Sequence, residues 1–384
     1  MASSREAERD AWLVLAAVEG VGPRTLSALV GAAGGAAAVL TRAGRGDWRW
    51  LPPELPLAPQ LRARLHAAHR PAPFAALAAR MGLWMLTPLD ASYPARLGVL
   101  PDPPAVLFGR GSPEALRGEA AVAIVGTRHP TLLGRALASD VAALMAGCGA
   151  VIVSGLAIGI DGAAHAAALR AGGTTVAVIG AGHGHGGPRA HRALEAAIVA
   201  QGGAVISELA PATPPTRGTY PRRNRLLSAL SDAVAVIEAP ARSGALNTAH
   251  HALEQGRPLF VAPGRPSDPA TAGCLRLLRE TEARVLTGPL ELLEDLGLSV
   301  APVRAARGSP GEPAGRAAAL AGLRGGERLV AAALCEAPAG LDRLVERTGL
   351  EPGAVSGSLA LLQLRGWVQA IDGTFLVAGV LSHP

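Results

Sequence analysis

The sequence predicts an α/β protein with a mainly parallel sheet at its centre, a helical module before the sheet and a winged-helix module after it. Between residues 121 and 287, apolar segments rich in β-branched residues alternate with helical stretches, which is typical of a parallel sheet covered on both faces. Near the N-terminus a glycine-rich turn joins two apolar helical stretches, and the sequence closes with three helices and a hairpin.

The N-terminal module, residues 1–72, is expected to contain short helices within residues 11–42. The turn between them, Gly20-Val21-Gly22-Pro23, is typical of a helix-hairpin-helix, whose glycines let backbone amides approach a phosphate. An ordinary tight turn between two helices explains this segment equally well. The Pro- and Arg-rich residues 51–73 are expected to end the module.

The central domain, residues 73–300, is expected to hold seven short strands that alternate with helices. The strands are predicted at residues 121–126, 150–155, 174–180, 204–208, 233–239, 258–263 and 284–287.

After the central domain, residues 301–320 are rich in Pro, Gly and Ala and carry no apolar period, which predicts a linker. Residues 321–384 then contain three helical stretches and two β-prone runs joined by Asp372-Gly373, in the order of a winged helix-turn-helix.

The composition favours a folded chain, because 49% of the residues are hydrophobic and 17% are charged. No apolar run reaches the ~18 residues needed to span a bilayer, and the first ten residues are polar, so we expect a cytoplasmic protein without membrane contact. The three cysteines lie far apart in the sequence, which argues against a disulfide framework or a structural zinc site.

The distribution of charge points to the first 320 residues as the part that attracts polyanions. The sequence contains no lysine, so all 36 basic residues are arginines, and the net charge is +6. Residues 321–384 contain five arginines and six acidic residues, a net charge of −1, which leaves +7 for residues 1–320.

Small residues follow several predicted strands, where ligands bind in open parallel sheets. Exposed amides at such turns form anion sites, so we expect a phosphate-binding pocket there. An arginine-rich helix entrance, residues 220–225, suits nucleic-acid phosphates in the same place. The turns of interest contain Gly126, Thr127, Arg128, Ser154, Gly155, Gly180, Gly182, Ser243, Gly244 and Gly264, and the helix entrance adds Arg222, Arg223, Asn224 and Arg225.

Other polar residues carry weaker signals. Asp161 is expected to cap a helix, and the role of His165, one helical turn later, stays open. His183, His185 and His191 allow a metal site, but no Cys or acidic ligand accompanies them, and a glycine-rich loop is the preferred interpretation. The sequence has no GxGxxG motif that opens a helix, no GxSxG or HExxH motif and no convincing carboxylate pair, so neither a catalytic site nor a cofactor is predicted.

These motifs together resemble the DNA-processing protein A family (DprA/Smf). The resemblance is carried by the runs SGLAIGIDGAAHAAAL (154–169), YPRRNR (220–225), EA (238–239), SGALNTA (243–249), GR (256–257) and PG (263–264), with DASYP (90–94) and DPPAVLF (102–108) upstream. It extends over nearly the whole chain, because the N-terminal hairpin and the C-terminal winged module match as well.

The resemblance implies an extended Rossmann-like fold with a helix-hairpin-helix (SAM-like) domain before it. It also implies a homodimeric, non-enzymatic protein that binds and protects single-stranded DNA and loads recombinase RecA during natural transformation and homologous recombination. Carried over by position, the DNA-binding residues are Gly126, Thr127, Arg128, Ser154, Gly155, Arg222, Arg223, Asn224, Arg225, Ser243, Gly244 and Gly264, with no metal and no cofactor.

The sequence departs from the family pattern at a few positions. Gly184 and Gly187 replace an Asp and the Tyr of a Tyr-Pro pair, and residues near Gly273 differ as well. These changes, which include Leu275, Thr281 and Glu282, affect the expected floor of the pocket and predict a weaker affinity for DNA.

Two other functions compete with this one. A nucleotide-processing enzyme of the lysine-decarboxylase-like Rossmann group would share the architecture, but residues 243–248 lack that group's glycines and nearby glutamate. A transcription regulator would use the winged helix, but the expected recognition helix, residues 352–364, has no basic residue before Arg365.

Overall fold

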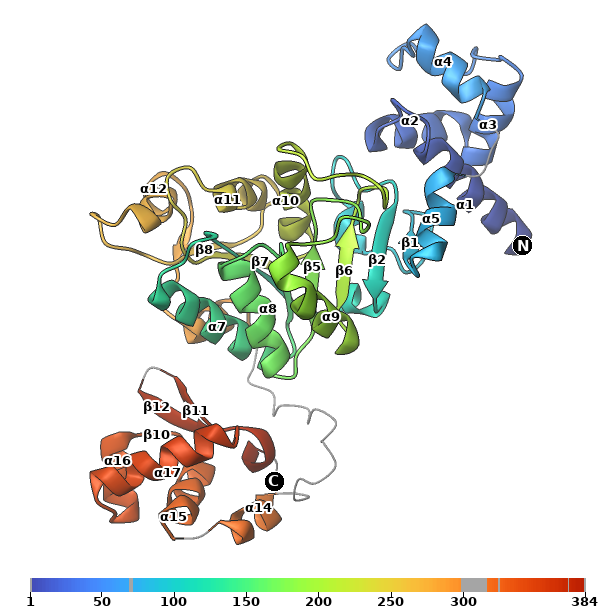
Figure 1. Cartoon of the computed structure of the whole chain (residues 1–384). Helices are drawn as coiled ribbons and strands as arrows, with labels where there is room; N and C mark the ends of the chain where they lie inside the picture. The colour runs from blue at the N-terminus through green and yellow to red at the C-terminus, as the bar shows by residue number, and fades with distance from the viewer. Residues whose placement is uncertain (1, 69–71, 298–315, 324, 372, 383–384) are drawn as a thin grey trace. The chain divides into compact units, whose positions relative to one another are not determined.

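The computed structural model of the chain describes residues 2–68, 72–297, 316–323, 325–371 and 373–382 (Figure 1). The chain divides into two compact units, one made of nearly all of residues 1–296 and the other of residues 297–384. Most of the predicted linker, residues 301–320, lies outside the described residues. Its last part is helical instead, because α14 (Arg316–Gly322) begins there.

The first unit opens with a helical bundle that contains more helices than the sequence predicted. They are α1 (Ala2–Ala16), α2 (Pro23–Ala33), α3 (Ala36–Gly44) and α4 (Pro59–His66). Leu15, Leu26, Leu29 and Val39 are fully buried between them. In the glycine-rich turn, Gly20 adopts a φ of +93°, a conformation that favours glycine, and Gly22 directly precedes α2.

No single helix among the described residues is long and apolar enough to cross a membrane. By length and composition the consecutive helices α2 and α3 pass that test only as a pair, which is bent by 83°. Both helices contribute buried residues to the core of the N-terminal bundle.

The centre of the unit is one sheet of nine strands in the order β1-β2-β6-β5-β4-β3-β7-β8-β9. The seven strands from β6 to β9 in this order are parallel, and all seven were predicted. The strands are β1 (Trp84–Leu86), β2 (Leu107–Gly111), β3 (Ala121–Val125), β4 (Val151–Ser154), β5 (Thr175–Val178), β6 (Ala204–Ser207), β7 (Ala233–Val236), β8 (Leu259–Val261) and β9 (Arg284–Val285).

Two strands at one edge of the sheet were not predicted. β2 pairs antiparallel with both β1 and β6. Its sequence, LFGRG, contains two glycines, which lower strand propensity and hide the apolar pattern. Gly109 is required by packing, because a Cβ there would lie 2.0 Å from the Trp84 ring of β1.

Helices cover both faces of the sheet (Figure 1). α7 (Leu132–Gly147), α8 (Ile160–Arg170) and α9 (Arg192–Ala200) lie on one face, and α10 (Thr219–Ala229), α11 (Gly244–Glu254) and α12 (Ala272–Glu280) lie on the other. The short helices α5 (Pro73–Arg80), α6 (Ala95–Gly98) and α13 (Pro289–Asp295) complete the unit.

The order of the strands creates a crevice between β3 and β7. From β3 the chain proceeds through β4 and β5 to β6 and then crosses back to β7, on the other side of β3. The connections that leave β3 and β7 therefore diverge to opposite faces of the sheet. Such a switch point is where open α/β sheets bind ligands.

The second unit is a winged helix, as predicted. Its three-stranded sheet has the order β10-β12-β11, and β11 and β12 form the hairpin of the wing. Its core includes Val330, Leu344, Val355 and Leu362. The elements after α14 are α15 (Gly325–Glu336), β10 (Ala339–Gly340), α16 (Leu341–Thr348), α17 (Pro352–Leu364), β11 (Val368–Ile371) and β12 (Thr374–Val377).

Candidate nucleic-acid interface

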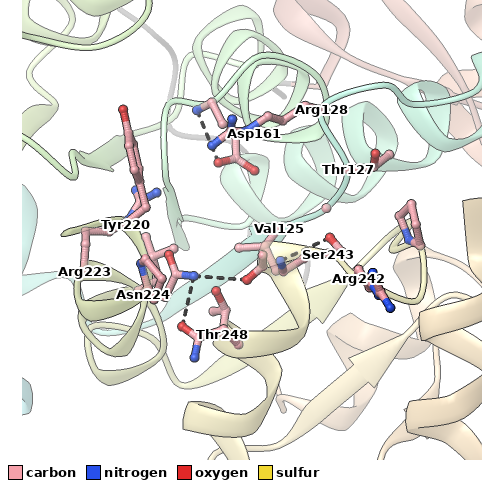
Figure 2. A pocket seen from close by; sticks show the side chains of 18 of the residues that line it. Val125, Thr127, Arg128, Asp161, Tyr220, Arg223, Asn224, Arg242, Ser243 and Thr248 are labelled. Atoms are coloured by element: carbon pink, nitrogen blue, oxygen red, sulfur yellow. Dashed lines mark hydrogen bonds between the residues drawn. The ribbon is translucent and has the colours of Figure 1, made fainter. Parts of the chain in front are cut away.

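A pocket of about 400 Å³ lies at the switch point between β3 and β7. We call it the switch-point pocket, and Figure 2 shows Tyr220 and Arg223 on one side of it and Ser243 and Arg242 on the other. Its lining residues are Val125, Gly126, Thr127, Arg128, His129, Ala157, Asp161, Tyr220, Pro221, Arg223, Asn224, Leu227, Pro240, Arg242, Ser243, Gly244, Ala245, Asn247 and Thr248.

Seven of the twelve residues predicted to bind DNA line this pocket. They come from the turn after β3, the first turns of α10 and the start of α11, which are far apart in the sequence. The seven are Gly126, Thr127, Arg128, Arg223, Asn224, Ser243 and Gly244.

The pocket receives the N-terminal ends of three helices. Asp161 belongs to the first turn of α8, Tyr220 to that of α10, and Gly244 begins α11. Ser243 caps α11, because its hydroxyl accepts a hydrogen bond from the amide of Ala245 at 3.2 Å. The partial positive charges of helix N-termini favour an anion at such a place.

The charged side chains in the pocket are mostly cationic. Arg128 and Arg242 are exposed, and Arg223 is buried with 6% of its surface accessible. Asp161 is the one acidic residue of the lining, and it is buried to the same degree. The pocket therefore presents positive charge to solvent and keeps its carboxylate inside.

Asp161 and Arg223 are the two buried charged residues that line the pocket. The Asp161 carboxylate accepts hydrogen bonds from the amides of Gly155 at 3.1 Å and Ala157 at 3.3 Å, while Arg223 donates to the carbonyl of Val178. Burial raises the pKa of Asp161, and the positive charge of Arg223 opposes that shift. The predicted helix-capping role of Asp161 is wrong in detail, because these amides precede α8 instead of opening it.

Gly155 is where this pair meets the loop after β4. A Cβ at this position would lie 2.4 Å from an Arg223 nitrogen and 2.6 Å from an Asp161 oxygen. Glycine lets the carboxylate and the guanidinium pack against the loop.

A smaller pocket of about 220 Å³ adjoins the first one. We call it the side pocket; it shares Arg128, His129, Ala157 and Tyr220 with the switch-point pocket. The Arg128 guanidinium stacks over the Tyr220 ring, 5.7 Å from its centroid. The rest of the lining is largely apolar or glycine and comprises Gly155, Ile158, Ile179, Gly180, Ala181, Gly186, Gly187 and Pro188.

Arg225 does not belong to the switch-point pocket, contrary to the prediction. It is buried, and its guanidinium pairs with Glu208 at 2.8 Å and with Asp102 at 3.1 Å. Arg222 is the exposed arginine of this segment, but its guanidinium also lies near Glu208, at 3.4 Å, and it does not line the pocket. The density of arginine in the motif did not distinguish the side chains that face a carboxylate from those that face the pocket.

Ser154 and Gly264 are also not pocket residues. The Ser154 hydroxyl is fully buried and donates to the carbonyl of Ile124 at 2.6 Å, which joins β4 to β3. Gly264 lies against Thr271, whose side chain would be 2.0 Å from an added Cβ. Arg223 lines the pocket as predicted, and its side chain is buried.

Sequence reasoning missed several lining residues. Tyr220 and Asn247 were part of recognised motifs without being assigned to the site, and His129 and Arg242 flank residues that were assigned. Their position directly beside Arg128 and Ser243 is the signal that could have found them. Asn224 links α10 to α11, because its side-chain Nδ2 donates a hydrogen bond to the Gly244 carbonyl at 3.1 Å.

The departures from the family pattern fall outside the switch-point pocket. Gly187 lines the side pocket, and Leu275 and Thr281 lie on and directly after α12. Neither these residues nor Glu282 form the pocket floor.

The histidines of the glycine-rich loop contact backbone carbonyls of other segments. No group of three or more His, Cys, Asp or Glu residues in the described part of the chain could hold a metal ion. His191 contacts the Leu156 carbonyl at 3.0 Å, and His185 faces the Ala212 carbonyl at 3.2 Å. His165, whose role was left open, is fully buried beside Thr175.

Comparison with known proteins agrees with this architecture. Residues 84–297 match the model of the DNA recombination-mediator protein A family, and residues 314–374 match that of the DprA winged helix domain. Protein Smf of Escherichia coli is 37% identical over 294 residues, which cover 76% of each chain. DNA processing protein DprA of Bacillus subtilis is 40% identical over 204 residues, 53% of this chain and 68% of that protein.

Two solved structures have a similar fold. DNA processing protein A from Streptococcus pneumoniae superposes with a TM-score of 0.57 and 30% identity, covering 72% of this chain and 98% of that one. DNA processing protein A from Helicobacter pylori, a structure that addresses its single-stranded DNA binding mode, gives a TM-score of 0.51 at 31% identity over 56% and 95% of the two chains. From the matched domains, the identities and the shared fold, we conclude that this chain belongs to the DNA recombination-mediator protein A family.

Proposed function

We propose that this protein binds single-stranded DNA without sequence preference and holds the phosphates of the strand in the switch-point pocket. The observation that carries the proposal is the charge of that pocket. Arg128 and Arg242 are exposed in it, the N-terminal turns of three helices line it, and its acidic residue, Asp161, is buried. Charge-assisted contacts to phosphate are the main source of affinity for a nucleic acid.

The side pocket supports a single strand over a duplex. Most of its lining is apolar or glycine, and the stacked pair Arg128 and Tyr220 lines both this pocket and the switch-point pocket. An unpaired base can turn toward an aromatic ring and a small apolar hollow while its phosphate stays with the arginines. In a duplex the bases are stacked inside and cannot enter such a hollow.

The cellular role that fits this activity is the protection of incoming DNA and the loading of recombinase RecA in natural transformation and recombination. We propose this role, together with homodimer formation in the cytoplasm, because the chain belongs to a family of recombination mediators. The nucleotide-processing alternative is not retained, because the family to which the chain belongs is one of recombination mediators.

The proposal is tested by measuring fluorescence anisotropy with single-stranded and double-stranded oligonucleotides across a range of salt concentrations. We expect preferential binding of the single strand and an affinity that falls steeply as salt rises, because phosphate contacts release counterions. Equal affinity for duplex DNA, or an affinity insensitive to salt, would contradict the proposal.

The switch-point pocket is tested by Arg128→Ala and Arg242→Ala. Each should weaken binding and lower the logarithmic salt slope by ~0.7, the share of one phosphate contact on a single strand. Arg170→Ala is the matched control. Arg170 is exposed at the C-terminal end of α8, and the substitution removes the same charge. A loss of affinity as large in Arg170→Ala would show that only net charge matters.

A further inference from the structure

A third pocket, with a volume of about 520 Å³, lies beside the loop after β5. We call it the loop pocket. The unpredicted strand β2 supplies Arg110 to it, the loop supplies residues 183–186, and α9 supplies the remaining side. Its lining residues are Arg110, His183, Gly184, His185, Gly186, Arg192, Glu195, Ala196, Val199 and Ala200.

The side pocket lies between the other two pockets, because it shares lining residues with each of them. Arg128, His129, Ala157 and Tyr220 line both the switch-point pocket and the side pocket. Gly186 lines both the side pocket and the loop pocket. A strand that leaves the switch-point pocket past Tyr220 therefore has the loop pocket ahead of it.

The loop pocket presents positive charge. Arg192 is exposed at the start of α9, and the Arg110 side chain is 40% exposed. Glu195 is the acidic residue of the lining; its side chain is only 14% exposed, and it lies 4.0 Å from the Arg110 guanidinium. Glu195 therefore offsets part of the charge of Arg110, and Arg192 has no such neighbour in the lining.

His183 has a ring nitrogen in the loop pocket that can accept a hydrogen bond and has no donor among the described residues. The ring is 6% exposed, and its Nε2 lies 3.2 Å from the Phe108 carbonyl, so this nitrogen carries the proton. Burial lowers the pKa of His183 to about 4, which keeps the ring neutral at pH 7. Nδ1 is then an acceptor, and it has no hydrogen-bond partner within the described part of the chain. Each DNA base carries an N–H donor on its Watson–Crick edge, and a single strand leaves that edge unpaired.

We propose that the loop pocket binds a further nucleotide of the same single strand, with its phosphate held by Arg110 and Arg192. The proposal rests on the proposed function and extends its site across the side pocket. It makes the loop after β5 and strand β2 part of the DNA-binding surface, in addition to the ends of β3 and β7.

The test compares Arg110→Ala/Arg192→Ala with the unchanged protein in anisotropy titrations on a single strand of ~16 nucleotides, the upper range for one binding fold. Loss of the phosphate that both arginines hold should weaken binding several-fold and lower the logarithmic salt slope by ~0.7. Arg170→Ala is again the charge control and should leave the salt slope unchanged. Arg192→Ala alone, at an exposed position, covers the case in which the double variant loses its fold.

A second variant tests the same pocket in the opposite direction. Glu195→Gln removes the carboxylate that lies near Arg110 and should tighten binding by a few-fold, because it frees a cation for the phosphate. Thermal unfolding of each variant checks that the fold is intact.

The outcomes separate this inference from the function on which it rests. If Arg128→Ala weakens binding while the Arg110, Arg192 and Glu195 variants match the unchanged protein, the loop pocket is not part of the path, and the proposed function stands. If the unchanged protein itself binds no single strand, the proposed function fails first. Equal losses in Arg170→Ala and Arg192→Ala would also overturn the loop pocket.

Discussion

The arginines of residues 222–225 have different environments in spite of their proximity in the sequence. Arg225 is buried between Glu208 and Asp102, Arg223 is buried under the switch-point pocket, and Arg222 is half exposed. One turn of α10 therefore contains a side chain that holds the fold together and another that supports the pocket.

Arg225→Ala is expected to lower the free energy of unfolding by ~3–5 kcal/mol, because it leaves the buried carboxylate of Glu208 without its closest partner. Arg222→Ala is the matched control; its side chain is 49% exposed, and its loss should cost about 1 kcal/mol or less. Urea unfolding of the two variants measures the difference. Similar effects of both substitutions would contradict a structural role specific to Arg225.

His165 makes the stability of the protein depend on pH. Thr175 donates its hydroxyl proton to the Ile152 carbonyl at 2.7 Å, so its oxygen accepts from Nδ1 of His165, also at 2.7 Å. Burial lowers the pKa of His165 from 6.5 to about 3. The unfolded chain therefore takes up a proton below about pH 6.5 while the folded chain does not, and stability falls as the pH is lowered through this window.

The expected loss approaches ~1.4 kcal/mol per pH unit for this one group. His183, whose pKa is lowered to about 4, contributes in the same direction. The measurement is urea unfolding of the unchanged protein and of His165→Asn between pH 7 and 4. The difference between the two curves isolates His165, and a difference that does not change with pH would rule out this account.

At the scale of elements, the glycines of the pocket loops have two separate roles. Gly155, after β4, is in close contact with Arg223 and Asp161, whereas no atom lies within 4 Å of a Cβ placed on Gly244 at the start of α11. The first glycine makes room for packing, and the second leaves the helix end open toward the pocket.

Gly155→Ala is expected to destabilise the protein by ~1–3 kcal/mol, the usual cost of overpacking. It should also weaken binding of single-stranded DNA, because the added methyl group displaces Arg223 from the pocket floor. Gly244→Ala is the control for stability and should change it by ~0.5 kcal/mol or less. Thermal unfolding and anisotropy measure the two effects, and an unchanged stability of Gly155→Ala would contradict the packing found here.

At the scale of the whole molecule, the expected recognition helix of the winged-helix unit, α17, lacks the basic residues of a DNA reader. The exposed residues of α17 include Ser356, Ala360, Leu361 and Gln363, and none of its residues is basic. Arg365, which follows the helix, pairs with Glu327 at 3.2 Å. A helix that reads DNA presents cations to the phosphates on either side of the groove.

We therefore expect removal of residues 298–384 to leave the affinity for single-stranded DNA within a few-fold of the full chain. The remaining residues contain the complete nine-stranded sheet and all three pockets. Anisotropy with both proteins measures the effect. A truncated protein that stays folded but loses most of its affinity would assign DNA binding to the winged helix.

Local sequence patterns were sufficient for the order of the elements and for much of the site. The parallel strands are continuous apolar runs, because both of their faces are buried. Helices separate these runs, so the alternation can be recognised from the sequence alone. The turn containing Gly126, Thr127 and Arg128 and the turn containing Ser243 and Gly244 were found for a similar reason, because each follows a recognisable strand.

What only the tertiary structure decided is which side chains meet. Whether an arginine faces the pocket or a carboxylate depends on partners far away in the sequence, as the pairing of Arg225 with Asp102 shows. Strand β2, interrupted by Gly109 and Gly111, gains its register from β1 and β6 and not from its own propensity. The loop pocket depends on that strand, because Arg110 reaches α9 only after β2 has paired with β6. Local composition specifies the elements, whereas long-range pairing of charges and backbone groups determines the surface that they form.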